Sequence, residues 1–292
     1  IRDIKKLEQT GCLYETSNIL FGEGGAGMYS DGKLTTRINK PEIAWFYKQL
    51  EYFEAPESVF YLSKPHIGSD KLMNILQKIR NYILSNGSAI SFEEQITDLI
   101  FNENRLVSIR SDRNEYATES VIMATGHSAR DTYLLLKQKN VALEKKNFAV
   151  GMRIEHPQEL INTIQYGNSK FTDCLPAAEY QAAFNNTKTK RGVYSFCMCP
   201  GGTVVNASSE QKHLCVNGMS YFARDLEYAN AAIVVTVNPD DTGAGIFSGI
   251  EFQRTLEKKA FLHGGDSFYA PVQSVDSFLK NKTDSITIHT SY

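Results

Sequence analysis

Four glycines at positions 22–27 constrain this 292-residue chain more than any other feature of its sequence. A backbone with so little side-chain surface can take positive φ angles and can lie flush against a flat or anionic ligand. A hydroxyl, a carboxylate and an ammonium group follow at Ser30, Asp31 and Lys33. A flexible linker is the alternative interpretation, but aromatic and aliphatic residues flank this stretch, which is unusual for a linker. We therefore interpret residues 21–34 as a loop that cradles a ligand.

The composition limits the classes of partner. The net charge is −2, so there is no basic field to attract nucleic acid or an anionic membrane. No apolar run reaches the roughly 18 residues that a membrane-spanning helix needs. Five cysteines, of which only Cys197 and Cys199 are close together, are typical of a reducing compartment, which predicts a cytoplasmic protein. The start at Ile1 has neither a Met nor an apolar signal core, which favours an excised piece of a longer chain. The oligomeric state stays open.

In the first half of the chain, helical spacing of apolar residues is followed by alternating strands. The expected helices are 41–54, 69–86 and 131–139. The expected strands are 89–92, 95–101, 106–110 and 116–123, joined as a β-meander. The last of these ends in an apolar run that leads directly into Ala124-Thr125-Gly126.

A second region begins near residue 147, where strands dominate. Its expected strands are 148–154, 179–184, 192–197, 203–207, 213–217 and 231–237, in a mostly antiparallel sheet. Its expected helices are 157–165 and 250–262. We therefore expect two domains, 1–145 and 146–292, and a fold class that combines α/β and α+β parts.

The tripeptide Ala124-Thr125-Gly126 places small residues at the carboxyl end of an apolar strand. Nucleotides bind at that edge of open α/β sheets. An ordinary strand-to-helix turn explains the tripeptide equally well when it is taken alone. His127 follows directly, so we expect it to contact the same ligand.

Three long, ordered segments carry a family resemblance: 22–37 (GEGGAGMYSDGKLTTR), 121–132 (VIMATGHSARDT) and 195–209 (SFCMCPGGTVVNASS). Segments 148–160, 216–225 and 249–258 support the same match. Together they resemble FAD-dependent, NAD-utilising dehydrogenase-like flavoproteins with a glutathione-reductase-type FAD fold. The resemblance implies that 1–145 is part of an FAD/NAD(P)-binding domain, with the meander as its insertion, and that 146–292 is a substrate or cap domain. It also implies FAD as cofactor, NAD(P)H as a possible electron donor and a small-molecule substrate.

The resemblance also implies the cofactor-binding residues of this chain. Ala124, Thr125 and Gly126 would lie near the FAD ribose and pyrophosphate, with His127 beside them, and the backbone of Ile96 would face adenine. The loop residues implied to line the cofactor are Gly24, Gly25, Ala26, Gly27, Ser30, Asp31, Gly32 and Lys33.

The chain departs from the family pattern at the pyrophosphate motif. A complete member opens with a strand, Gly-x-Gly-x-x-Gly and a helix N-terminus. Residues 22–27 match the letters of that motif, but 13–20 is a poor buried strand and 30–32 a poor helix start, so we reject the match. A carboxy-terminal flavin-contacting segment is also missing after Tyr292. We therefore expect an internal fragment that is inactive alone and that binds FAD weakly or not at all.

The candidates for direct chemistry are few. His66 and Lys33 are the weak catalytic candidates, and a loop histidine that caps the following helix is an equal explanation for His66. Cys197 and Cys199 suggest a redox pair, but neighbouring same-face cysteines in a strand are poorly placed for a disulfide, so buried small side chains are favoured. Arg224 either reaches the site or forms a surface ion pair with its neighbour. No second Cys or His pair has metal-ligand spacing, so we expect no metal.

The function that these observations favour is an FAD-dependent oxidoreductase that transfers a hydride through the flavin. Lys33 and the amides of the glycine-rich loop would stabilise negative charge on the reduced flavin or on a phosphate. The alternative is a non-catalytic nucleotide-fold binding or interaction module, which the missing pyrophosphate motif favours.

Overall fold

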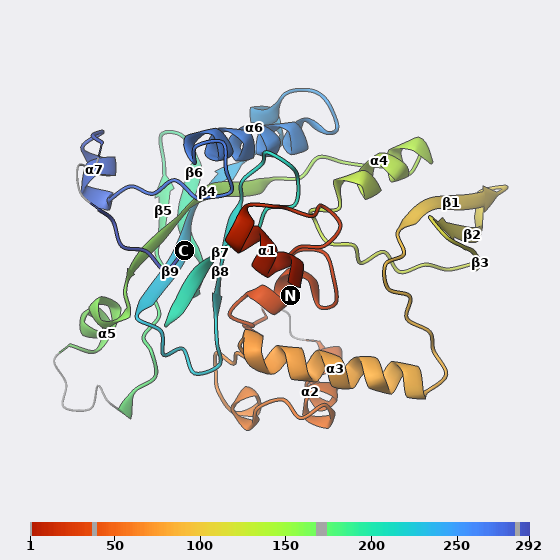
Figure 1. Ribbon diagram of the computed structural model, residues 1–292, viewed down its shortest axis with the longest axis horizontal. Helices are drawn as coiled ribbons and strands as arrows, with labels where there is room; N and C mark the ends of the chain where they lie inside the picture. Colours follow the sequence, from red (N-terminus) through yellow and green to blue (C-terminus); the bar gives the residue numbers. More distant parts are fainter. Residues whose placement is uncertain (1, 37–39, 168–173, 284–286) are drawn as a thin grey trace.

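A computed structural model describes residues 2–36, 40–167, 174–283 and 287–292. Within these residues, the fold combines helices with antiparallel sheets of three, four and two strands (Figure 1). This arrangement confirms the α+β part of the predicted fold class. None of the helices in the described ranges is long and apolar enough to cross a membrane.

The amino-terminal part is helical and has a core of its own. Its elements are α1 (Arg2–Thr10), η1 (Gly25–Tyr29), α2 (Pro41–Tyr52), η2 (Glu57–Phe60) and α3 (Ser69–Ser85). The predicted helices 41–54 and 69–86 are thereby confirmed. Apolar side chains of α2, α3 and the segments between them are buried together, including Leu50, Val59 and Ile75. This cluster supports the segment from Pro65 to Gly68, which lies against the glycine-rich loop.

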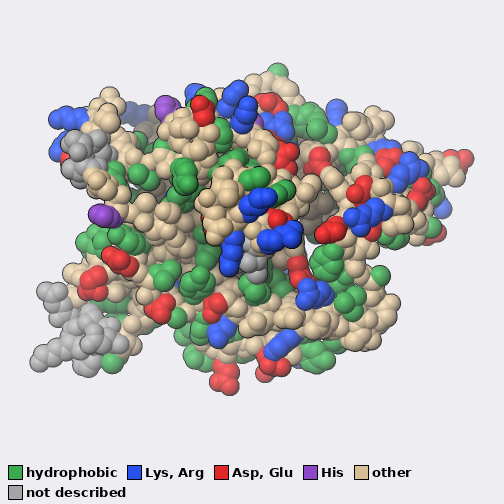
Figure 2. Space-filling view, viewed as in Figure 1, with side chains coloured by type: hydrophobic (Ala, Val, Ile, Leu, Met, Phe, Trp, Pro, Cys, Tyr) green, Lys and Arg blue, Asp and Glu red, His purple; other side chains and the backbone are tan. Residues whose placement is uncertain are grey.

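The predicted β-meander forms from β1 (Ile96–Asn102), β2 (Arg105–Ser111) and β3 (Glu115–Ala117). It lies at the right-hand edge of the molecule in Figure 1, away from the other sheets. Figure 2 shows charged side chains of both signs crowded over this edge.

One predicted strand, 89–92, is wrong, and another, 116–123, is longer than the strand that forms. Residues 89–92 form no strand, and β3 ends at Ala117, so the segment 118–123, with its apolar run 121–123, is not part of any sheet. Val121, Ile122 and Met123 are exposed, Ile122 to 94%. A strand with an apolar run on both faces is typical of a sheet in which neighbouring strands pair with it and both faces are covered. Among the described residues no strand pairs with 118–123, and all recorded strand pairs are antiparallel. The glutathione-reductase-like α/β part and the division at 145/146 therefore stay predictions.

The second half is built on a four-stranded antiparallel sheet in the order β4-β9-β6-β5, with a separate β7-β8 pair. Its strands are β4 (Phe148–Pro157), β5 (Ala183–Asn186), β6 (Arg191–Cys199), β7 (Gly202–Asn206), β8 (Val216–Ser220) and β9 (Tyr228–Val237). Its helices are α5 (Gln158–Tyr166), η4 (Pro239–Thr242), α6 (Ser248–His263) and α7 (Val275–Leu279), and α4 (Arg130–Gln138) precedes it. The predicted strands correspond to these elements, although β5 and β8 begin three or four residues later than expected.

The two faces of β9 are covered by side chains of different kinds, apolar on one face and polar on the other. Side chains alternate along a strand, so Ala229 and Ala231 share one face and Asn230 points to the other. The two alanines join the apolar core with Ile161 of α5, and each of the three β9 residues is 0% exposed. Asn230 instead lies among polar side chains between the sheet and β8. This polar layer is where the candidate site forms.

Candidate functional site

The glycine-rich loop is held in place by a short antiparallel pairing with the segment before α3. The amide of Leu34 donates to the carbonyl of Pro65 at 2.9 Å, and that of Ile67 donates to Gly32 at 3.0 Å. Gly68, at φ +75°, needs to be glycine, because a Cβ there would lie 2.2 Å from the amide nitrogen of Phe222. The loop, the start of α3 and the chain after β8 therefore form one layer.

Asp31 is the most buried charged group of this layer, at 1% exposure. Its carboxylate accepts from Lys33 Nζ at 2.5 Å and from Arg224 Nε at 2.9 Å. Arg224 Nη2 also contacts the carboxylate. The Arg224 side chain is only 11% exposed, so the expectation of a surface ion pair with its neighbour is wrong. The structure brings Arg224 to the loop instead.

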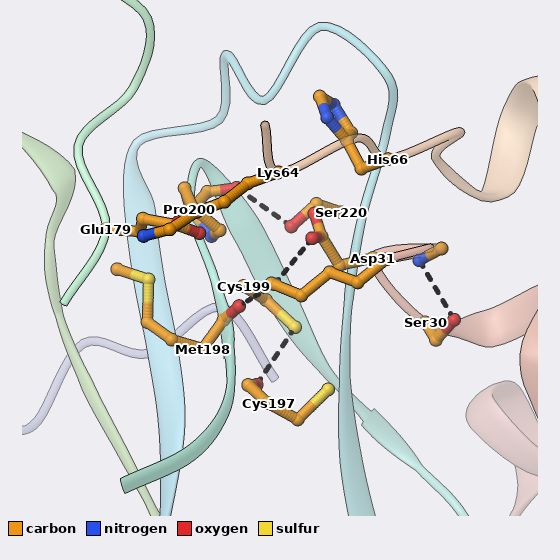
Figure 3. A network of polar contacts seen from close by, with 12 residues as sticks. Ser30, Asp31, Lys64, His66, Glu179, Cys197, Met198, Cys199, Pro200 and Ser220 are labelled. Carbon is orange, nitrogen blue, oxygen red and sulfur yellow. Dashed lines mark hydrogen bonds and ion pairs between the residues drawn. The ribbon is translucent and has the colours of Figure 1, made fainter. Parts of the chain in front are cut away.

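Lys33 also reaches across to β6, where it donates to the carbonyl of Met198. β6 contains a β-bulge there: Phe196 pairs with Ala232 but Cys199 pairs with Asn230, so β6 has one extra residue. Cys197 takes the left-handed φ of +45° at this bulge. Figure 3 shows Asp31 and Met198 close to this bulge. It also shows the sulfur of Cys199 pointing toward the Cys197 carbonyl.

Arg153 of β4 holds the other side of the bulge. Its Nη2 donates to the carbonyl of Cys197 at 2.9 Å, and its Nε donates to Oδ1 of Asn230 at 2.7 Å. The guanidinium lies directly under β8, where a Cβ on Gly218 would be 2.2 Å from Nη2. Two cations thus bind two successive carbonyls of β6. We call Asp31, Lys33, Arg153, Cys197, Cys199 and Arg224 the Asp31 cluster.

The two cysteines of the cluster differ in environment. Cys199 is 0% exposed, whereas Cys197 is partly exposed. Interaction with the Cys199 thiol, together with the positive charges of Lys33 and Arg153, lowers the pKa of Cys197 well below the ordinary thiol value. The interaction with Cys197 and burial raise the pKa of Cys199, so Cys199 stays a protonated donor.

His66 is placed beside the cluster by its backbone bridge to Lys33. Its Nε2 lies 3.0 Å from the carbonyl of Phe222, and its ring stacks on the Phe222 ring with centroids 5.4 Å apart. Burial lowers the pKa of His66, which favours the neutral ring at pH 7. The geometry therefore shows a histidine that ties two segments together; its catalytic role stays a prediction.

The predicted residues at the start of the loop lie near its surface. Gly24 and Gly27 are exposed, and Gly25 and Ala26 are partly exposed at the start of η1. Gly24 has φ +82°, and a Cβ there would meet Met28 Cγ at 2.3 Å. Ser30 donates from its hydroxyl to the carbonyl of Gly27 at 2.8 Å, which closes the turn. The glycines are thus explained by a tight turn that leaves backbone open to solvent.

The structure does not bring the other predicted cofactor residues to this loop. Residues 124–127 are exposed and precede α4, and Ile96 is 42% exposed at the start of β1. Within the described ranges, no hydrogen bond or ion pair joins residues 124–127 or Ile96 to the glycine-rich loop. The described residues also contain no group of three His, Cys, Asp or Glu side chains that could hold a metal ion.

The comparisons with known proteins agree with a flavin family. Residues 147–292 match the family model described as "FAD-dependent protein, C-terminal domain-like", which is half of the chain. The chain belongs to this family. A Clostridium beijerinckii protein described as "Uncharacterized protein" is 46% identical over 283 residues, covering 97% of this chain and 53% of that protein. The chain thus spans about half the length of this relative.

The family match confirms the coarser part of the predicted identity, an FAD-dependent family. The match includes five members of the polar layer, Arg153, Cys197, Cys199, Arg224 and Asn230, whereas Asp31 and Lys33 precede it. The relation to glutathione-reductase-type proteins, the status as an internal fragment and the use of NAD(P)H stay predictions.

Sequence reasoning missed Arg153 and Asn230. A signal was present for both, because each is a polar residue inside an otherwise apolar strand: Arg153 in FAVGMRI and Asn230 in YANAAIVV. A buried polar residue in an apolar strand needs a partner. The partner itself depends on the register between β4 and β9, which sequence does not supply.

Proposed function

We propose that this chain is part of an FAD-dependent oxidoreductase and that the Asp31 cluster faces the flavin. The observation that supports it best is the charge of the cluster beside a glycine-rich turn. Lys33, Arg153 and Arg224 supply three positive charges against the one carboxylate of Asp31. A half-buried site with excess positive charge favours an anionic ligand or an anion that forms during reaction.

The donor set fits a flavin. FAD is flat, carries carbonyl oxygens on its ring and has an anionic pyrophosphate, so it needs backbone that can approach closely and cationic donors. The turn at Gly24–Gly27 supplies backbone that a ligand can approach closely, and Lys33 supplies a cationic donor. Nδ2 of Asn230 is a buried donor without a hydrogen-bond partner among the described residues, which gives the layer one further group for an acceptor.

Bound FAD would supply the hydride chemistry itself. The residues of this chain would bind and orient the flavin. Asp31 fixes the Lys33 ammonium and the Arg224 guanidinium, so that both charges are oriented before a ligand binds. We further propose that NAD(P)H is the hydride donor and that the substrate is a small molecule.

The second candidate is a non-catalytic nucleotide-fold binding or interaction module. The exposure of residues 124–127 and of the apolar run 121–123 favours it, because the predicted nucleotide edge is not assembled within the described residues.

A binding and reduction experiment separates the two candidates. This chain and the longer Clostridium beijerinckii relative are purified, mixed with FAD and freed of unbound FAD by gel filtration, and their visible spectra are recorded. The proposal expects the relative to retain the flavin absorption band and to lose it on addition of NADH or NADPH. It also expects Lys33→Met of this chain to weaken any FAD binding more than Lys78→Met, a change at an exposed surface pair. A relative that stays colourless with added FAD contradicts the proposal.

A further inference from the structure

We infer that Cys197 is a nucleophilic thiol that hydroperoxides oxidise, and that Cys199 is the thiol that resolves the product as a Cys197–Cys199 disulfide. This inference concerns the chain's own side chains and does not depend on a bound flavin.

The β-bulge gives the two cysteines a geometry that a regular strand does not. In a regular strand, residues i and i+2 point the same way and their side chains stay apart. Here the extra residue and the φ of +45° at Cys197 turn the chain between them. The Sγ of Cys199 points back toward Cys197 and lies 3.4 Å from its carbonyl oxygen (Figure 3). The sequence-based argument against a disulfide assumed a straight strand, so it does not apply.

The different burial of the two cysteines indicates which one reacts with the hydroperoxide and which one resolves the product. Cys197 is partly exposed, so a small hydroperoxide can reach it from solvent, whereas Cys199 is 0% exposed and can react only with a group already inside the protein. A reactive thiol next to a buried second thiol is the arrangement of redox-sensitive cysteine pairs.

The cations of the Asp31 cluster supply the activation. Lys33 and Arg153 bind the carbonyls of Met198 and Cys197, so their positive charges lie on either side of the bulge. A thiolate is the reactive form of cysteine, and nearby cations stabilise it. The lowered pKa of Cys197, to which the Cys199 thiol and the Lys33 and Arg153 charges contribute, agrees with this geometry.

A separate observation points to a group that binds at this place. Asn230, directly opposite Cys199 in the β6–β9 pairing, is 0% exposed and its Nδ2 has no hydrogen-bond partner among the described residues. Buried donors are nearly always paired in native proteins. A hydroperoxide or sulfenic oxygen beside the bulge would give this donor an acceptor.

The chemistry balances in two steps. The Cys197 thiolate attacks the hydroperoxide ROOH, an S–O bond forms as the O–O bond breaks, and one proton is taken up to give Cys197–SOH and ROH. The Cys199 sulfur then attacks the Cys197 sulfur, an S–S bond forms as the S–O bond breaks, and the departing hydroxide takes the Cys199 proton and leaves as water. The two thiols lose two electrons in total, and the hydroperoxide gains them.

The first test measures the pH profile of Cys197 alkylation by iodoacetamide, site by site, with mass spectrometry. A thiol of ordinary pKa is only about 1% thiolate at pH 6.5. The folded chain is expected to keep at least about tenfold more of its maximal Cys197 rate at pH 6.5 than the same chain unfolded in urea. Lys33→Met should move the profile to higher pH, whereas Lys78→Met should leave it unchanged. Equal profiles in the folded and unfolded chains overturn the inference.

The second test treats the folded chain with an equimolar amount of hydrogen peroxide. A Cys197–Cys199 disulfide is expected, detected as a loss of two hydrogens from the peptide that holds both residues. Cys199→Ser should instead leave Cys197 as a sulfenic acid that dimedone traps, and Cys197→Ser should give neither product. If oxidation falls on the exposed Cys12 while Cys197 stays reduced, the inference is wrong.

Discussion

Asp31 is the residue on which the Asp31 cluster depends, because it is the one carboxylate between Lys33 and Arg224. Asp31→Asn keeps the shape of the side chain but removes its charge. Two cations would then lie close together without a counter-charge, and removing one partner of a buried ion pair is strongly destabilising. The Lys33 side chain is 28% exposed and water can solvate part of its charge, so we expect the free energy of unfolding to fall by about 3 kcal/mol. Urea denaturation measures it.

The matched control is Asp276→Asn, which removes a carboxylate from an exposed ion pair with Lys280. Exposed pairs of this kind contribute little, so its expected cost is below about 0.5 kcal/mol. Equal costs for the two variants would mean that the Asp31 pairs are as well solvated as a surface pair.

At this scale, sequence reasoning found the residues that are close together in the chain. Ser30, Asp31 and Lys33 were selected because they follow the glycines, and the structure places Asp31 and Lys33 in one ion pair. No local signal in the sequence links Arg224 to Asp31, because almost two hundred residues separate them. Arg153 and Asn230 were missed for the same physical reason: their meeting is a consequence of strand register.

At the scale of elements, Gly218 of β8 decides how closely β8 approaches the four-stranded sheet. A Cβ there would lie 2.1 Å from Asn230 Oδ1 and 2.2 Å from Arg153 Nη2. Gly218→Ala should therefore push β8 away or displace the guanidinium, at a cost of about 2 kcal/mol. Gly245→Ala, where a Cβ meets nothing within 4 Å, should change stability by less than about 0.5 kcal/mol. Thermal denaturation of both variants measures the two changes in stability. If Gly218→Ala is as stable as Gly245→Ala, β8 can shift freely.

The elements that sequence predicted well carry their signal locally. α3 has a periodic apolar stripe and β9 has a long β-branched run, and both formed where expected. The run 121–123 is as apolar as a buried strand but lies exposed, because a strand also needs neighbours and the sequence pattern does not say which strands are present. β8 lies later than predicted because the alternation of His213, Leu214 and Cys215 suits a strand, yet pairing with β7 begins only at Val216.

For the whole molecule, α4 connects the protruding meander to the second half. Lys139 pairs with Asp98 of β1 at 2.6 Å, so α4 holds the meander at one end. At its other end Arg130, with a side chain only 9% exposed, pairs with Glu257 of α6 at 2.7 Å and with Glu210 at 3.0 Å. Figure 1 shows α4 between the meander and α6. Arg130 therefore ties α4 to α6, while Lys139 and Asp131 tie α4 to the meander.

This arrangement predicts the result of Arg130→Met. The substitution keeps the apolar stem but leaves Glu257 without its strongest partner, so α4 should open more often while β1 and β2 keep their own ladder. We expect a loss of about 2 kcal/mol in the local opening free energy, seen as roughly 30-fold faster amide exchange in residues 130–138. Arg191→Met, which removes a half-exposed pair with Asp241, is the control and should leave α4 exchange unchanged. If exchange rises equally in β1, β2 and α4, the meander and α4 unfold as one unit and α4 is not a separate connection.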